Sequence, residues 1–82
     1  MGRIDNISSK QALKVFQKIG FEKVSQKGSH IKMRRYVSDH QQTITIPDHK
    51  RIKTGTLVKG ILRPINLSIE DFLKLLKNIS PK

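Results

Sequence analysis

The sequence predicts an α+β domain in which one helix precedes a three-stranded antiparallel sheet and helical segments follow it. Three observations predict this order: apolar residues at helical spacing near the start, a two-residue period from Phe21 onward, and helical spacing again after Thr56. With 82 residues the chain is long enough for one domain, which we place at residues 1–82. The predicted order is α-β-β-β-α-α, with the helices on one face of the sheet.

The first helix is expected at about residues 9–19. Ser8 and Gln11 have the spacing of a capping box, and Gly20 supplies a C-terminal stop. Three lysines recur every fourth residue on the side opposite the apolar residues. They form a basic stripe, although a charged outer face is also what an ordinary solvated helix shows: Lys10, Lys14 and Lys18.

Three short strands are expected next, at residues 21–26, 30–37 and 42–46. The first turn is Lys27-Gly28-Ser29, the second spans residues 38–41, and Pro47 ends the third strand. Because alternate side chains of a strand point to opposite faces, the apolar residues should face the first helix: Ile31, Met33, Ile44 and Ile46. The other face then carries a histidine, two cations and an aromatic residue from one strand: His30, Lys32, Arg34 and Tyr36.

A basic loop at residues 48–53 follows, and we expect Thr54 or Thr56 to cap the next helix. Pro64 should limit that helix, because its ring would clash with the carbonyl group of Gly60.

Asn66 is expected to take a left-handed conformation, and Ser68 and Asp71 have the spacing that caps a last helix.

The charge balance indicates a polyanionic partner. There are 17 Lys and Arg against 6 Asp and Glu, a formal net charge of +11. Nucleic acid and an acidic protein both fit this charge, and a merely solvated surface is the alternative.

No run approaches the ~18 apolar residues of a membrane span, so no membrane partner is expected. The start lacks a secretory signal and the chain has no cysteine, which favours the cytoplasm.

The sequence gives little indication of a metal-dependent catalytic site. Asp39 and Asp48 stand singly in different loops, which disfavours a two-metal site, and the three histidines lack recognisable zinc-ligand spacing. A Ser-His-Asp triad remains open, although no nucleophile elbow is present. We therefore expect no metal and no cofactor.

RNA offers a route without a metal, because its own 2′-OH can attack the adjacent phosphate once a base removes the proton. Histidine exchanges protons near neutral pH, so His30 is the candidate catalytic residue, although a histidine on a wet face is often only a surface residue. Neighbouring cations can stabilise the phosphoryl charge: Lys27, Lys32 and Arg34. Tyr36 could stack on a base or serve only in packing.

Four short motifs carry a resemblance to a known family. They occur in this order: Gln26-Lys27-Gly28-Ser29-His30, then Pro47-Asp48-His49, then Gly55-Thr56-Leu57, then Ile61-Leu62. In this order and spacing the chain resembles the HicA (YcfA-like) family of messenger RNA interferase toxins, from Ser8 to Leu76. Two residues depart from the family pattern. Pro64 interrupts a segment that usually continues as helix in the family, and Asn66 stands where family members often have glycine.

The resemblance implies a fold like the double-stranded RNA-binding domain and a metal-independent ribonuclease whose catalytic residue is the histidine of the Gly-Ser-His turn, here His30. It also implies a cognate HicB antitoxin that covers the active face; such partners are commonly acidic, which fits the net charge. For His49 we favour a role in holding the basic loop, with RNA contact as the second interpretation.

Our hypothesis is an endoribonuclease toxin that cleaves messenger RNA and arrests translation. We expect it to be a monomer when free and a hetero-oligomer with its HicB-type antitoxin. The expected RNA-binding residues are Lys27, Ser29, Lys32, Arg34, Tyr36, Lys10 and Lys14. The alternatives are a non-catalytic RNA-binding module and, least favoured because no helix-turn-helix pattern stands out, a DNA-binding regulator.

Overall fold

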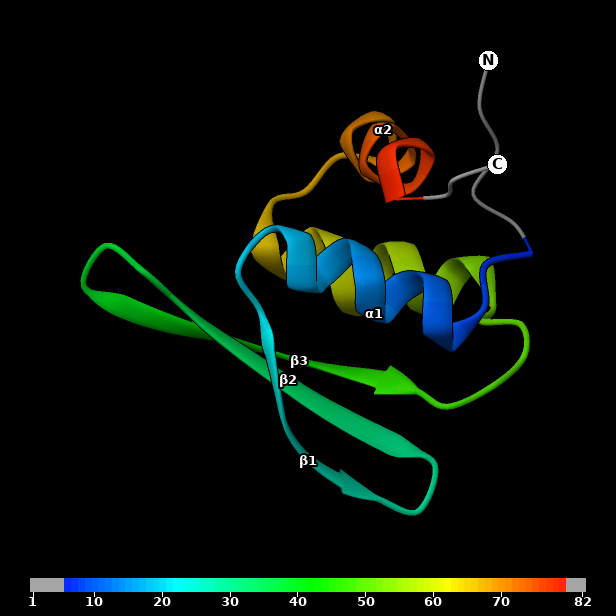
Figure 1. The fold of residues 1–82 in the computed structure, drawn as a ribbon, viewed down its shortest axis with the longest axis horizontal. Helices are drawn as coiled ribbons and strands as arrows, with labels where there is room; N and C mark the ends of the chain where they lie inside the picture. Colours follow the sequence, from blue (N-terminus) through cyan, green and yellow to red (C-terminus); the bar gives the residue numbers. More distant parts are fainter. Residues whose placement is uncertain (1–5, 80–82) are drawn as a thin grey trace.

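A computed structural model describes residues 6–79 and shows one helix, three strands and then three helical segments (Figure 1). In chain order they are α1 (Ser9–Lys18), β1 (Glu22–Lys27), β2 (His30–Val37), β3 (His40–Pro47), the π-helix η1 (Thr56–Leu62), the 3₁₀ helix η2 (Arg63–Ile65) and α2 (Ile69–Ile79). The predicted α+β class and element order are confirmed.

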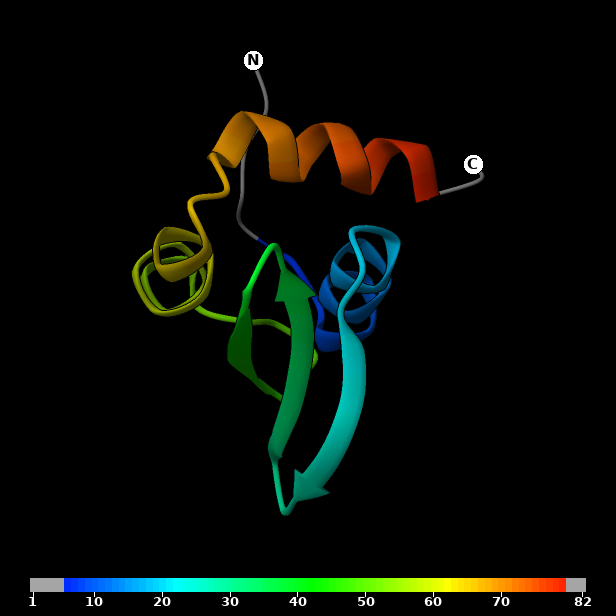
Figure 2. The same ribbon diagram turned by 90° about the vertical axis from the view of Figure 1, so that its left-hand side faces the viewer.

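The helices lie on one side of the antiparallel sheet, whose strand order is β1-β2-β3. Figures 1 and 2 show α1 and η1 next to each other over the sheet, with α2 crossing above them. The opposite face of the sheet carries no other element of the described chain. The fold therefore leaves one broad sheet face open to a partner.

The core is formed between the sheet and the helices. Phe16 of α1 is fully buried, and its ring lies 5.8 Å from the rings of both Phe21 and Phe72, measured between centroids. Aromatic pairs at this distance add to the stability that burial supplies. These contacts connect the first helix to the start of the sheet and to α2.

The first helix begins as predicted. The Ser8 hydroxyl accepts a hydrogen bond from the Gln11 backbone N–H (3.2 Å), and the Gln11 side chain accepts one from the Ser8 backbone N–H (2.9 Å). This reciprocal pair satisfies two N–H groups that have no partner within the helix. The start of α1 is thus fixed, and the Ser9 N–H joins it to the His49 carbonyl oxygen in the loop that follows β3.

Strand alternation is confirmed along β2. Its inward residues Ile31 and Met33 are buried, and on β3 Ile44 and Ile46 are buried opposite them. β3 begins at His40, two residues earlier than predicted, because the turn before it contains only Ser38 and Asp39. Ser38 adopts a φ of 56°, which permits this tight connection.

The segment after the sheet differs from the prediction. Neither Thr54 nor Thr56 caps the helix through its side chain: within the described chain, η1 starts at an N-cap Gly55 without a side-chain hydrogen bond. The helix is also a π-helix, in which the Arg63 N–H donates to the carbonyl group of Val58. The proline ring of Pro64 would collide with a carbonyl four residues earlier in an α-helix, and the wider turn relieves that conflict.

The chain then turns into α2 as predicted. Asn66 is left-handed, with φ 58° and ψ 35°, and the Ser68 hydroxyl accepts a hydrogen bond from the Asp71 N–H (3.0 Å). Both features end one helix and start the next. None of the helices in residues 6–79 combines the length and the hydropathy that crossing a membrane requires.

Candidate active site

The Gly28-Ser29 turn joins β1 to β2 and makes His30 the first residue of β2. Lys27 and His30 are paired across the turn, so only two residues form the connection. Gly28 has a φ of 60°, a conformation that glycine adopts without a steric penalty. The local sequence therefore fixes where His30 emerges from the sheet.

His30 is exposed and lies at the corner where β2, β1 and the loop after β3 meet. Its backbone pairs with Lys27 on one side and with Pro47 on the other. The Asp48 N–H donates to the carbonyl oxygen of Ser29 at 2.7 Å, which joins the loop to the turn. The histidine is accessible to a large substrate although its backbone is held on both sides.

Asp48 also holds the turn through its side chain, a role that the sequence analysis did not assign. One carboxylate oxygen accepts a hydrogen bond from the Ser9 hydroxyl (3.1 Å), and the other accepts one from the Gln26 amide (3.1 Å). The same Gln26 amide nitrogen donates to the carbonyl oxygen of Gly28 at 3.2 Å. Asp48 therefore connects α1, β1 and the turn that carries His30.

The outward residues of β2 extend from His30 along the open sheet face. Lys32 and Arg34 follow at alternate positions and pair with Thr45 and Thr43 of β3. Tyr36 is 72% exposed at the far end. At about 3.3 Å per residue, His30 and Tyr36 are about 20 Å apart along the strand. The sheet brings these four side chains to one face, as alternation predicts.

The remaining expected RNA-binding residues lie in different places. Lys27 precedes the turn and is paired with His30, and Ser29 lies within the turn directly before His30. Lys10 lies in the first turn of α1 and borders a surface hollow next to the loop after β3. Lys14 is exposed one turn further along α1, on the helical side of the molecule rather than on the open sheet face. The structure thus groups Lys27 and Ser29 with His30, places Lys10 beside the loop after β3, and leaves Lys14 apart from both.

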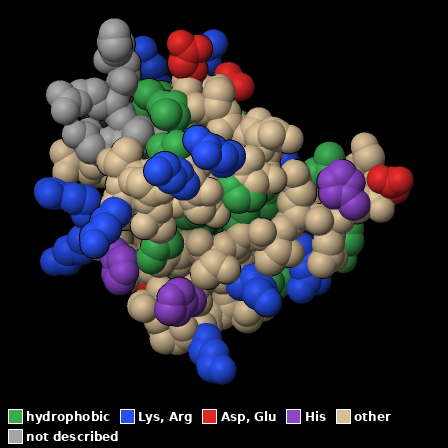
Figure 3. Space-filling model, turned by 180° about the vertical axis from the view of Figure 1, so that it is seen from behind, with side chains coloured by type: hydrophobic (Ala, Val, Ile, Leu, Met, Phe, Trp, Pro, Cys, Tyr) green, Lys and Arg blue, Asp and Glu red, His purple; other side chains and the backbone are tan. Residues whose placement is uncertain are grey.

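The loop after β3 brings a second histidine to the same end of the molecule. The His49 carbonyl oxygen accepts a hydrogen bond from the Ser9 N–H (3.0 Å), and the His49 N–H donates to the Pro47 carbonyl oxygen (3.0 Å). The first interpretation of His49, that it holds the loop, therefore has a basis in its backbone. Figure 3, which shows the molecule from behind relative to Figure 1, has two histidine side chains close together at one end.

The charges around this end are mostly positive. In Figure 3 the prominent acidic side chains lie at the upper and right-hand edges, whereas Lys and Arg side chains surround the two neighbouring histidines. His40 belongs to the other end of the sheet, where its Nδ1 lies 3.6 Å from an Asp39 carboxylate oxygen. This distribution favours an anionic ligand at the Gly-Ser-His end.

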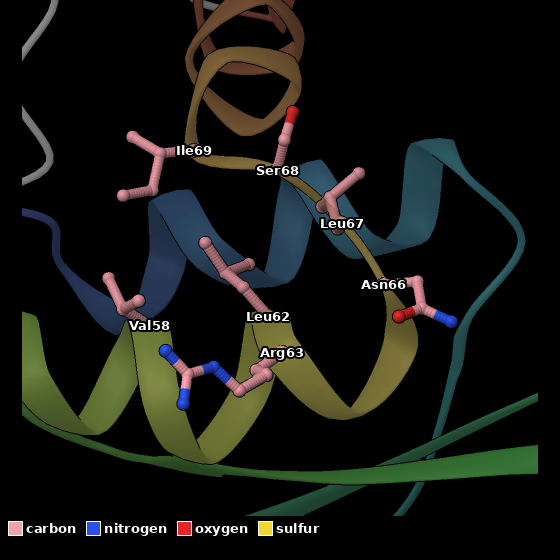
Figure 4. Close-up of a pocket in the computed structure, with 7 residues that line it drawn as sticks. All are labelled: Val58, Leu62, Arg63, Asn66, Leu67, Ser68 and Ile69. Carbon is pink, nitrogen blue, oxygen red and sulfur yellow. The ribbon is translucent and has the colours of Figure 1, made fainter.

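A second hollow lies between η1, η2 and the start of α2 (Figure 4). The apolar side chains of Val58, Leu62 and Ile69 border it, and its lining contains one charged residue, Arg63. Its lining lacks a group that exchanges protons near neutral pH, so this hollow is a weaker candidate for a catalytic site than the hairpin end that carries His30. Across residues 6–79, no three His, Cys, Asp or Glu side chains come together in a group that could hold a metal ion.

Arg35 is another residue whose role the sequence analysis missed. It follows Arg34 but points to the opposite face, where its guanidinium lies 4.8 Å from the centroid of the Phe21 ring. It donates to the carbonyl oxygen of Ile19 (2.8 Å) and to the side chain of Gln42 (2.8 Å). Arg35 therefore closes the edge of the core, and alternation along β2 could have separated it from the outward cations.

The comparisons with known proteins agree with this architecture. Residues 9–67 match the family model described as "HicA toxin of bacterial toxin-antitoxin". The matched region begins with α1 and contains the whole sheet, the loop after β3, η1 and η2. No curated protein and no solved structure matches the chain significantly.

Proposed function

Because this chain belongs to the HicA family of toxins from bacterial toxin–antitoxin systems, we propose that it is a metal-independent endoribonuclease that cleaves messenger RNA. The observation that carries the proposal is the position of His30, which is exposed at a hydrogen-bonded hairpin end and begins a row of cations on an open sheet face. Cleavage of messages would arrest translation in the cytoplasm. That outcome is the one expected of a toxin.

In the proposed reaction His30 exchanges a proton with the reacting RNA, as general base toward the 2′-OH or as general acid. The 2′ oxygen attacks the neighbouring phosphorus, and negative charge develops on the phosphoryl oxygens. Cations within reach stabilise that charge: Lys27, Lys32 and Arg34. The chemistry needs only the RNA's own hydroxyl group and positioned side chains.

The RNA would follow β2 as a single strand. Phosphate groups contact Lys32 and Arg34, and a base stacks on the exposed ring of Tyr36 about 20 Å from His30. The hydroxyl of Ser29 and the ammonium groups of Lys10 and Lys14 add polar contacts at the edges of this path. Aromatic side chains on open sheets are a common platform for single-stranded RNA.

The partner that restrains the toxin is its cognate antitoxin. We propose a HicB-type protein with an acidic surface that covers His30 and the cationic row, since charge complementarity with the net +11 would guide association. The toxin would be a monomer when free and a hetero-oligomer with that antitoxin. In this arrangement inhibition and catalysis compete for one surface.

The test uses purified protein, a single-stranded messenger RNA and EDTA. Wild-type protein should cleave, and His30→Ala should lose on the order of 10²–10⁴-fold in rate while keeping the wild-type circular dichroism spectrum. His40→Ala is the matched control and should cleave normally, because His40 lies at the other end of the sheet. Salt-sensitive RNA binding without any cleavage would instead indicate a non-catalytic RNA-binding module.

A further inference from the structure

We propose that His49 is the second proton-transfer residue, the general acid that protonates the departing 5′ oxygen while His30 acts as the base. This inference rests on the proposed ribonuclease function and extends it to a residue to which neither the motifs nor the family match gives a catalytic role. It follows from the position of the loop after β3, from the free imidazole of His49 and from the charges around both residues.

The backbone keeps the two histidines within reach of one phosphodiester group. His30 is paired with Pro47, and His49 lies two residues further along the chain. Consecutive Cα atoms are 3.8 Å apart and paired ones at most about 5.5 Å, so the Cα atoms of His30 and His49 lie within about 13 Å. The hydrogen bond from the His49 N–H to the Pro47 carbonyl group folds the loop and shortens this separation.

The loop is fixed by its backbone and not by the imidazole. Three backbone hydrogen bonds hold it next to His49: Asp48 N–H to Ser29 oxygen (2.7 Å), Ser9 N–H to His49 oxygen (3.0 Å) and His49 N–H to Pro47 oxygen (3.0 Å). The His49 residue is exposed, and the hydrogen bonds that hold it are made by its backbone N–H and carbonyl groups. The ring is therefore available to a substrate while its attachment point stays in place.

The surroundings of His49 favour an anionic group beside its ring. His49 borders a hollow of about 370 Å³, together with Ser8, Ser9, Lys10, Asp48 and Lys50. Two ammonium groups on its rim attract an anion, and both Asp48 carboxylate oxygens are already hydrogen bonded within the protein. Among the side chains at this end, imidazole is the type that both gives and takes protons near neutral pH.

The proposed step conserves atoms and charge. Neutral His30 takes the proton of the 2′-OH, the 2′ oxygen forms a bond to phosphorus, and the bond between phosphorus and the 5′ oxygen breaks. Protonated His49 gives its proton to that 5′ oxygen. The products are a 2′,3′-cyclic phosphate and a 5′-hydroxyl end, and proton exchange with water restores both histidines.

The experiment compares two RNA substrates that differ in one atom. The first is an unmodified RNA, and the second carries a bridging sulfur in place of the 5′ oxygen at the bond that the protein cleaves. A thiolate leaves without protonation, so the second substrate needs a base but no acid. The proteins are wild type, His49→Ala, His49→Gln, His30→Ala and the control His40→Ala, each checked for folding by circular dichroism and thermal melting.

With unmodified RNA, both His49 variants should cleave on the order of 10²–10⁴-fold more slowly than wild type. With the sulfur substrate they should cleave at a rate similar to wild type, whereas His30→Ala should stay defective and His40→Ala should behave normally with both. An equal defect of the His49 variants on both substrates, or no defect on either, would overturn the inference. Absence of cleavage by the wild-type protein would instead overturn the proposed function on which it rests.

Discussion

Removing the Asp48 carboxylate should loosen the turn that carries His30 and destabilise the domain. In Asp48→Ala the buried Ser9 hydroxyl, which is 5% exposed as a residue, loses its acceptor at 3.1 Å. A hydrogen bond to a charged group contributes about 1.5–3 kcal/mol, and the exposed bond from Gln26 adds about 0.5 kcal/mol. We expect a loss of about 2–3.5 kcal/mol in the free energy of unfolding.

Urea denaturation monitored by circular dichroism measures this loss as a lower midpoint at an unchanged slope. In thermal melting the same loss corresponds to a decrease of roughly 10–20 °C for a domain of this size. Cleavage should fall as well, by up to about 10²-fold, because the turn no longer holds His30 in register with the substrate. Asp48→Asn retains one acceptor and should lie between wild type and Asp48→Ala.

The control is Asp39→Ala. The Asp39 side chain is 99% exposed, and its pairing with His40 at 3.6 Å should add almost nothing to stability. A double-mutant cycle with Ser9→Ala isolates the buried hydrogen bond, so the two substitutions should be clearly non-additive. If Asp48→Ala changed the free energy of unfolding by less than about 0.5 kcal/mol, as ordinary surface substitutions do, the reasoning would be refuted.

Two further predictions concern the ends of β2. Gly28→Ala places a Cβ in open space but at a φ of 60°, so we expect about 1–2 kcal/mol of destabilisation in urea and slower cleavage, with Gly28→Asn less affected because asparagine tolerates positive φ. Tyr36→Ala should weaken binding of a single-stranded RNA by about 1–3 kcal/mol in a fluorescence titration, whereas Tyr36→Phe should bind like wild type. Equal binding by Tyr36→Ala and wild type would exclude base stacking at this position.

The sequence predicted the parts of the structure that local periodicity determines. The expected bounds of β2, residues 30–37, are those observed, because the Gly28-Ser29 and Ser38-Asp39 turns delimit an alternating segment on both sides. The same alternation sends His30 outward and Ile31 inward, so the orientation of the candidate catalytic residue was available from the sequence.

The features that the sequence did not predict depend on contacts between distant parts of the chain. Ser9 and Asp48 are 39 positions apart in the sequence, and no short motif predicts their hydrogen bond. The π-helix at η1 had a local signal in the distance from Gly60 to Pro64, but the sequence indicated a shortened helix, whereas the chain widens its turns and continues to Pro64. A proline can therefore be accommodated by a change of helix type when the helix has a core to cover.

These long-range contacts bear on how a hairpin end could carry the proposed catalysis. Hairpin ends are among the more mobile parts of a fold, whereas proton transfer requires groups held within a fraction of an ångström. Here Asp48 joins the Gly28-Ser29 turn to the capped start of α1, and the helix is in turn fixed to the core through Phe16. The same loop carries His49, so one set of hydrogen bonds sets the positions of both histidines. Asp48→Ala removes the side-chain bonds of this set and should impair the proposed base and acid together, so it should slow cleavage of both the oxygen and the sulfur substrate.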